Sequence, residues 1–127
     1  MNKWLRAVCV GAAAAAMLTA SAFAANYTNC ADSLHEMGLF QGTQNGYDLD
    51  RTPTRAEAAV MLVRLLGKEA EAKALTYTAP FTDLKGWEKP YVQYLHSNGL
   101  VNGTSRMTFN PTGKCTAQMY AVSLLRA

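Results

Sequence analysis

The spacing of apolar residues predicts a helix that starts after Thr54. Thr54-Arg55-Ala56-Glu57 has the pattern of a capping box, in which the threonine hydroxyl caps an amide and the glutamate reaches back. Gly67 follows the helix and is expected to end it, because glycine readily adopts a positive φ. Four apolar residues between these points lie at spacings of three and four and share one face: Ala59, Leu62, Val63 and Leu66.

Similar spacing predicts three further helices. A shorter one runs from Asn29 to Leu39, with Ala31, Leu34 and Gly38 on one face. A second ends at Gly99 and carries a stripe of larger side chains: Trp87, Tyr91, Val92 and Leu95. A third begins at Thr116 and runs to the end of the sequence, with a stripe of its own: Ala117, Tyr120, Ala121, Leu124 and Leu125. Gly38 and Gly99 are expected at helix ends with positive φ.

These helices belong to an internal repeat. Leu34-His35-x-x-Gly38-Leu39-x-x-Gly42-Thr43 recurs as Leu95-His96-x-x-Gly99-Leu100-x-x-Gly103-Thr104. The later helices match as well, because Thr54, Ala59, Val60, Leu62 and Arg64 correspond to Thr116, Ala121, Val122, Leu124 and Arg126. Each copy reads as helix, loop, helix, which predicts an all-α fold. The loops between the helices end on apolar residues that are expected to insert into the core: Tyr47 and Leu49, and Met107 and Phe109.

A connector joins the two copies. Lys68 to Leu75 favours a helix, and Glu69 and Lys73 are placed to form an ion pair four residues apart. Thr76 to Pro80 is expected to be extended. The predicted organisation is therefore residues 1–24 as a leader, 25–67 as the first repeat, 68–80 as the connector and 81–127 as the second repeat.

The leader changes the charge balance. Lys3 and Arg6 precede the uncharged stretch from Ala7 to Ala20, and Ser21 to Ala24 supplies small residues for cleavage, as in a secretory signal peptide. The 127 residues carry a formal charge of +3, and the leader holds two of the positive charges, which leaves +1. A near-neutral chain gives no indication of nucleic-acid binding. No second apolar run is long enough to span a membrane, so we expect an exported protein outside the cytoplasmic membrane.

Candidate catalytic chemistry is sparse. The sequence has no glycine-rich phosphate loop, nucleophile elbow or paired metal-ligand motif, so we expect no enzyme, cofactor or metal site. His35 and His96 occupy matching repeat positions, which favours a structural use such as packing. Cys30 and Cys115 are expected to be small buried residues, although export leaves a disulfide between them open.

Several motifs together resemble the S-layer homology (SLH) domain. They cover most of the chain after the leader: Thr54-Arg55-Ala56-Glu57, Phe81-Thr82-Asp83-Leu84, Trp87, Gly99-Leu100-Val101-Asn102-Gly103 and Phe109-x-Pro111. The resemblance implies helical units, usually three around a pseudo-threefold axis, that hold secreted Gram-positive proteins to the cell wall or S-layer. The implied ligand is a secondary cell-wall polysaccharide attached to peptidoglycan, often with pyruvylated sugar.

The resemblance also implies a glycan-binding site. Arg55, in the Thr-Arg-Ala-Glu motif, would contact the anionic sugar, since its planar fork of donors matches a carboxylate. Free backbone amides in the first turn of its helix would favour the same anion. Thr54 would cap the helix and help shape the site, while Gly42 and Gly103 would permit the loop turns that border the groove. Trp87 is either a core residue, which we favour, or a face on which a sugar rests.

The remaining candidates follow from departures from the family pattern. In the second repeat Ala117 stands where the motif has arginine, and Lys114 nearby is the candidate that would supply a charge there. Glu57 and Asp83 are expected to be structural. Only two of three usual units are present and the last helix runs to the end of the sequence, which leaves open a truncated product or a fragment. The alternative function is therefore a structural protein whose repeats pair with other SLH units.

Overall fold

The structure, a computed structural model, describes residues 27–127, and the predicted signal peptide lies outside them. The chain divides into two compact units, Met1–Leu49 and Asp50–Ala127, and each is considered by itself. Within residues 27–127 the regular structure is helical, and the only β pairing is two isolated bridges. The all-α prediction is confirmed, while the repeat boundaries stay a prediction.

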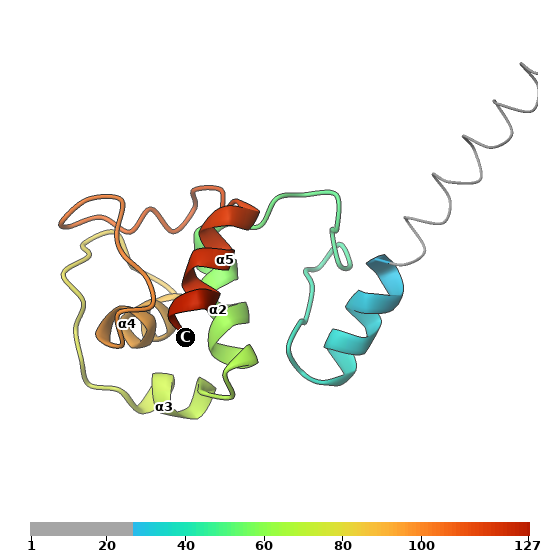
Figure 1. Cartoon of the computed structure of the whole chain (residues 1–127), viewed down its shortest axis with the longest axis horizontal. Helices are drawn as coiled ribbons and strands as arrows, with labels where there is room; N and C mark the ends of the chain where they lie inside the picture. The colour runs from blue at the N-terminus through green and yellow to red at the C-terminus, as the bar shows by residue number, and fades with distance from the viewer. Residues whose placement is uncertain (1–26) are drawn as a thin grey trace, which may run out of the picture. The chain divides into compact units, whose positions relative to one another are not determined.

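The first unit contains one described helix, at residues 27–36, drawn in blue in Figure 1. It ends as predicted at Gly38, which has a φ of 72°. The following loop folds back on the helix, because Tyr47 stacks on Phe40 at 5.5 Å between ring centroids and donates from its hydroxyl to Asp32 Oδ1 at 2.8 Å. Leu49 is 45% exposed, so its predicted insertion into the core is wrong.

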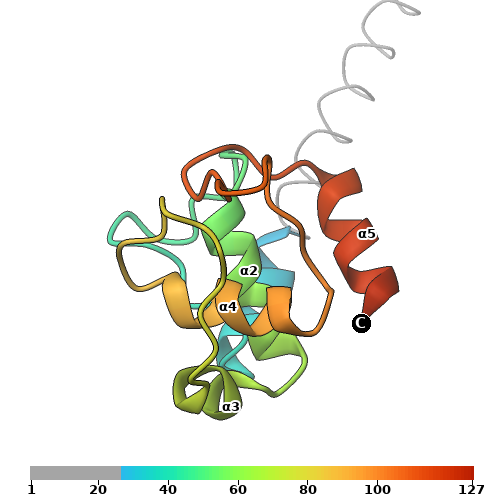
Figure 2. The ribbon, with the colours of Figure 1, turned by 90° about the vertical axis from the view of Figure 1, so that its left-hand side faces the viewer.

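The second unit is built from four helices: α2 (Arg55–Leu65), α3 (Glu69–Ala74), α4 (Lys89–Ser97) and α5 (Ala117–Arg126). α2 packs on α4, and α3 packs on both. Figure 2 shows these three helices grouped together, with α5 set apart from them. The core lies between residues 59 and 109, and its most deeply buried side chains come from α2, α4 and the loop after α4: Leu62, Val63, Val92, Leu95 and Phe109.

The connector contributes to this core. Ala72 on α3 is fully buried, and Ala79 in the extended segment after it is 5% exposed. Glu69 forms the predicted ion pair with Lys73 at 3.0 Å, and it also accepts a hydrogen bond from the Tyr91 hydroxyl on α4 at 2.7 Å. The helix and the extended chain predicted for this segment are confirmed. The connector is also part of the helical core, in which it packs together with α2 and α4.

The preferred core placement of Trp87 is wrong. α4 begins at Lys89, with Pro90 in its first turn, so Trp87 precedes the helix and is 60% exposed. The Glu88 carboxylate accepts hydrogen bonds from the backbone of Lys85 and Gly86, and Glu88 is the buried residue of this turn. This tight turn removes Trp87 from the face that it was predicted to share with Tyr91.

Three further expectations about burial are corrected. Met107 is 56% exposed, because only Phe109 of its loop reaches the core. Cys30 is exposed on the first helix, whereas Cys115 is buried as expected, and both are free thiols. α5 has no buried residue, and Leu125 of its predicted apolar stripe is 88% exposed.

The matched histidines pack against aromatic side chains, as predicted. The His35 ring lies edge-on to Tyr47, and its Nδ1 lies 2.9 Å from the carbonyl oxygen of Phe40. His96 lies 4.8 Å from Phe81 between ring centroids, and its Nδ1 is 2.8 Å from the Tyr77 hydroxyl. In each unit the histidine therefore ties a helix to a neighbouring segment of irregular chain.

Candidate functional site: a pocket beside Arg55

The start of α2 forms the predicted capping box. The Thr54 hydroxyl accepts from the Glu57 amide at 3.2 Å, and Glu57 accepts from the Thr54 amide at 2.7 Å. Arg51 then donates to both carboxylate oxygens of Glu57, at 3.0 and 2.9 Å. This pairing with Arg51, helped by the bonds from Thr54 and opposed by partial burial, lowers the pKa of Glu57 to about 2. Thr54 and Glu57 thus hold the start of α2 in place.

The backbone amides of this first turn are already occupied. Arg55 N donates to the carbonyl oxygen of Gly113 at 2.8 Å, and Ala56 N donates to that of Pro111 at 3.0 Å. The third amide, on Glu57, is bonded to the Thr54 hydroxyl. The expectation that free amides here would hold an anion is therefore wrong, because a loop far along the chain supplies acceptors for two of them and Thr54 supplies the third.

The Arg55 side chain is fixed by the loops after α4. Its Nε donates to the carbonyl oxygen of Phe109 at 2.8 Å, and one Nη donates to that of Asn102 at 3.0 Å. The guanidinium also lies over the Phe109 ring, 4.4 Å from the centroid. Partial burial lowers the pKa of Arg55, but an arginine remains charged at any physiological pH. The result is a positioned cation with donors that these two bonds do not use.

Asp83 orients the carbonyl that Arg55 contacts. Its carboxylate accepts from the amides of Phe109 at 2.9 Å and Asn110 at 2.7 Å. Burial acts to raise the pKa of Asp83, but these backbone bonds outweigh it, and the pKa lies below the ordinary value. Asp83 therefore locks the turn at Phe109, consistent with the structural role expected for it.

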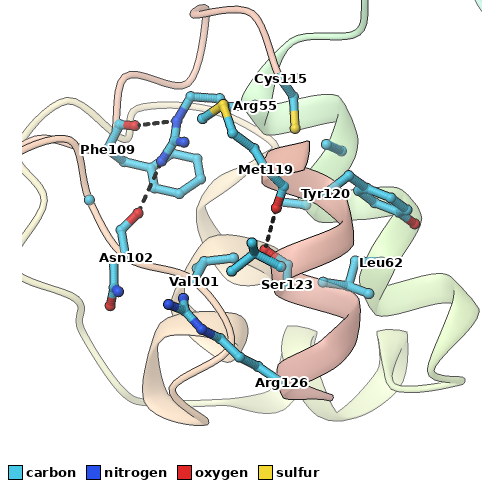
Figure 3. Close-up of a pocket in the computed structure, with 14 residues that line it drawn as sticks. Arg55, Leu62, Val101, Asn102, Phe109, Cys115, Met119, Tyr120, Ser123 and Arg126 are labelled. Atoms are coloured by element: carbon cyan, nitrogen blue, oxygen red, sulfur yellow. Dashed lines mark hydrogen bonds between the residues drawn. The ribbon is translucent and has the colours of Figure 1, made fainter. Parts of the chain in front are cut away.

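Arg55 lines a pocket of about 270 Å³, drawn in Figure 3. We call it the Arg55 pocket. Its walls are α2, the segment from Val101 to Phe109, and α5. Most of the lining side chains are apolar, and the charged ones are two arginines, Arg55 and Arg126, with no carboxylate among them. The pocket therefore suits a partly apolar ligand that carries negative charge.

Gly103 belongs to the pocket wall, and close packing requires a glycine there. A Cβ at this position would lie 2.5 Å from Phe81 Cε1 and equally close to the backbone oxygens of Ser105 and Thr108. Gly42, by contrast, has a positive φ of 74° and lies in the other unit. The expected turn-forming role thus fits Gly42, while Gly103 serves a tight contact.

The other predicted residues do not line this pocket. Thr54 caps α2 beside Arg55 without reaching the pocket, and Lys114 is exposed on the segment that bridges to Thr54. Trp87 lies in the turn before α4. The structure thus brings Arg55 and Gly103 together and leaves the remaining candidates outside the pocket.

Tyr120 and Arg126 on α5 also line the pocket, and neither was among the predicted glycan-binding residues. Burial raises the pKa of the Tyr120 phenol, which packs against the core. A signal for Arg126 existed in the repeat, because it matches Arg64, which forms an ion pair with Glu69 at 3.4 Å.

Residues 27–127 can also be considered for metal binding and for membrane spanning. In that part of the chain, no group of three or more histidine, cysteine or acidic residues is arranged to hold a metal ion. None of the helices described there is long and apolar enough to cross a membrane.

Comparison with known protein families identifies one that matches part of the chain. The model of the S-layer homology domain matches residues 80–116, which run from the connector's end through α4 to the start of α5. This stretch contains Asp83, Gly103 and Phe109, the residues that build and orient the loop side of the Arg55 pocket.

Curated relatives include cell-surface proteins. The chain is 32% identical over 116 residues to the middle cell wall protein of Brevibacillus brevis, covering 89% of this chain and 11% of that protein. It is 31% identical over 97 residues to a surface layer protein of Brevibacillus choshinensis, covering 74% and 9%. An endoglucanase of a Bacillus species is 33% identical over 95 residues, covering 74% and 10%. The chain thus spans about a tenth of the length of each.

These matches identify a kind of module. The S-layer homology domain is a non-catalytic module that anchors proteins at the bacterial cell surface. The endoglucanase match is compatible with this role, because the similar segment is a small part of that enzyme. Through residues 80–116, the chain belongs to the S-layer homology family.

Proposed function

We propose that the chain anchors at the cell wall by binding a secondary cell-wall glycan with acidic, pyruvylated sugars in the Arg55 pocket. The observation that carries this proposal is a fixed guanidinium in a pocket whose lining has no carboxylate. A pyruvyl ketal presents a carboxylate on a sugar ring, and it would complete the donor set of Arg55. Charge-assisted bonds to a carboxylate are among the stronger hydrogen bonds in proteins.

The contacts of Arg55 support recognition of a carboxylate in particular. Two carbonyl oxygens and the Phe109 ring hold the guanidinium plane, so little side-chain entropy is lost when a ligand binds. The apolar side chains of Ala58, Leu62 and Val101 offer a surface for the C–H face of a sugar. An acidic sugar matches both parts of the pocket.

Titration calorimetry of the full chain with purified pyruvylated wall polymer tests this proposal. Arg55→Ala is expected to weaken binding at least about tenfold, since hydrogen bonds to charged groups contribute about 1.5–3 kcal/mol each. Arg55→Lys keeps the charge but loses the fork, and it is expected to recover binding only in part. Removal of the pyruvyl groups from the polymer is expected to weaken the wild-type chain to a similar extent.

Arg106→Ala is the matched control, because Arg106 is exposed and lies outside the pocket. Circular dichroism of each variant checks that the fold is retained, since Arg55 also joins α2 to the segment between α4 and α5. Equal binding by the Arg55→Ala and Arg106→Ala variants, with both folded, would refute a role of Arg55 in glycan recognition.

A second candidate function is pairing with another SLH unit, favoured by the exposed face of α5. Val122 and Leu124 are 45% and 39% exposed. They match Val60 and Leu62 on α2, whose face is covered by α4, the first helix of the following repeat. An equivalent helix of another SLH unit would cover α5 in the same way. Light scattering after size exclusion tests this, and a monomer at all concentrations, alone and mixed with SLH proteins, would exclude it.

A further inference from the structure

We propose that Arg126 is a second anion-binding residue of the Arg55 pocket, and that the pocket takes a glycan segment with two acidic groups. This inference rests on the proposed function and specifies its ligand. Both arginines line the same pocket, one in the first turn of α2 and the other in the last turn of α5. Figure 3 shows the two side chains at opposite ends of the pocket.

Arg126 is available for a ligand in a way that its repeat counterpart is not. Arg64 donates from Nε to Glu69 Oε2 at 3.4 Å, and its side chain is only 16% exposed. Arg126 is exposed, and none of the ion pairs found within residues 27–127 includes it. The same position of the repeated helix therefore serves an internal contact in α2 and leaves a solvated cation at the pocket in α5.

A purely local role for Arg126 predicts a different outcome. A cation in the last turn of a helix interacts favourably with the helix dipole, whether or not a ligand is present. That role would affect the stability of α5 and would leave glycan binding unchanged. Binding measurements with defined ligands therefore separate the two roles.

The surface between the arginines indicates what lies between the two acidic groups. Figure 3 shows Val101 between the two arginines, with Asn102 and Ser123 beside it, so the wall there offers an apolar side chain flanked by polar ones. A sugar ring placed across it would present C–H groups to the wall and one acidic substituent to each guanidinium. The volume of about 270 Å³ is just below the roughly 300–1,000 Å³ typical of drug-sized ligand sites, and it suits a short glycan segment.

The acidic groups share one chemistry, an anionic oxygen group on a sugar, and two sources supply it. One is the carboxylate of a pyruvyl ketal, and the other is a phosphate carried by the glycan. Arginine binds both carboxylate and phosphate through parallel hydrogen bonds. The test therefore uses three disaccharides with one backbone: one with two pyruvyl ketals, one with a single ketal, and one with two phosphates.

The experiment measures dissociation constants of the full chain and of Arg126→Gln by calorimetry with each disaccharide. We expect Arg126→Gln to weaken the two-ketal ligand about tenfold and the one-ketal ligand less than threefold. Arg106→Gln, an exposed arginine outside the pocket, is the matched control and is expected to change either constant less than twofold. The two-phosphate ligand shows whether phosphate replaces the ketals, since equal loss with both two-acid ligands assigns the site to anions in general.

Two results overturn the inference. One is an Arg126→Gln variant that binds the two-ketal ligand as tightly as the Arg106→Gln variant does. The other is an equal loss for the one-ketal and two-ketal ligands, which would make Arg126 a contributor to general positive charge. Failure of the glycan-binding proposal itself looks different, because Arg55→Gln would then leave every ligand unaffected.

Discussion

Arg55 combines two tasks in one side chain. Its hydrogen bonds to the carbonyl oxygens of Phe109 and Asn102 join α2 to the loop after α4, and the same side chain lines the pocket. The motif around Arg55 predicted a cation at a helix start, and the structure has one. The carbonyl oxygens that occupy the first-turn amides come from Pro111 and Gly113, a contact across the fold that no local pattern encodes.

Glu57 makes the start of α2 sensitive to acid. Its pKa falls from 4.5 to about 2 on folding, so its contribution is present above about pH 4.5 and is lost as the pH falls through about 2. Glu57→Gln keeps a neutral cap and loses the pairing with Arg51. We expect the free energy of unfolding to fall by about 1 kcal/mol at pH 7, and the difference from wild type to shrink toward zero at pH 2.

Urea unfolding at a series of pH values measures this difference. Asp50→Asn is the control, because it makes the same charge change next to Arg51 on an exposed residue. Glu69, whose pKa is also about 2, keeps a residual pH dependence in both variants. A constant difference between Glu57→Gln and wild type from pH 7 to pH 2 would count against the ion pair.

At the scale of elements, α2 and α5 show what the spacing of apolar residues predicts about a helix and what it does not. Both helices begin at a threonine whose hydroxyl accepts from the amide three residues on, and the sequence predicted this cap for Thr54 and a helix start for Thr116. Their apolar stripes also match, yet that of α2 is buried under α4 and that of α5 is largely exposed. Periodicity identifies the face of a helix that favours burial, but which segment covers it is decided by the fold.

Trp87 shows a second limit of periodicity, which does not fix where a helix begins. Pro90 and the turn at Glu88 place Trp87 outside the helix.

Matched leucines on these two helices test the difference in burial. Leu62 is 2% exposed on α2, and its repeat counterpart Leu124 is 39% exposed on α5. We expect Leu62→Ala to lower the free energy of unfolding by about 2–5 kcal/mol, because it leaves a cavity in the core. Leu124→Ala is expected to cost less than about 1 kcal/mol. Chemical denaturation of the two variants measures both values, and similar losses would mean that α5 is packed more tightly than its exposure indicates.

At the scale of the whole molecule, the repeats in the sequence and the units in the structure are offset. α2, which the repeat assigns to the first copy, packs on α4 of the second, and the connector completes their core through Ala72 and Ala79. Self-similarity predicted the all-α fold and the helices, because each copy repeats the same local signals. It did not predict the packing, because α2 of the first copy packs on α4 of the second copy. The Arg55 pocket results from this packing between copies, because its walls come from both of them.

The proposed function of the whole molecule depends on the Arg55 pocket, which would anchor the chain to an acidic wall glycan. The most direct measurement is co-sedimentation of the full chain with purified wall sacculi, before and after extraction of the secondary polymer. We expect the wild-type chain to pellet with intact sacculi and to be released by extraction, and we expect Arg55→Ala to pellet much less while Arg106→Ala pellets normally. Equal pelleting of all three proteins with intact and extracted sacculi would contradict this proposal.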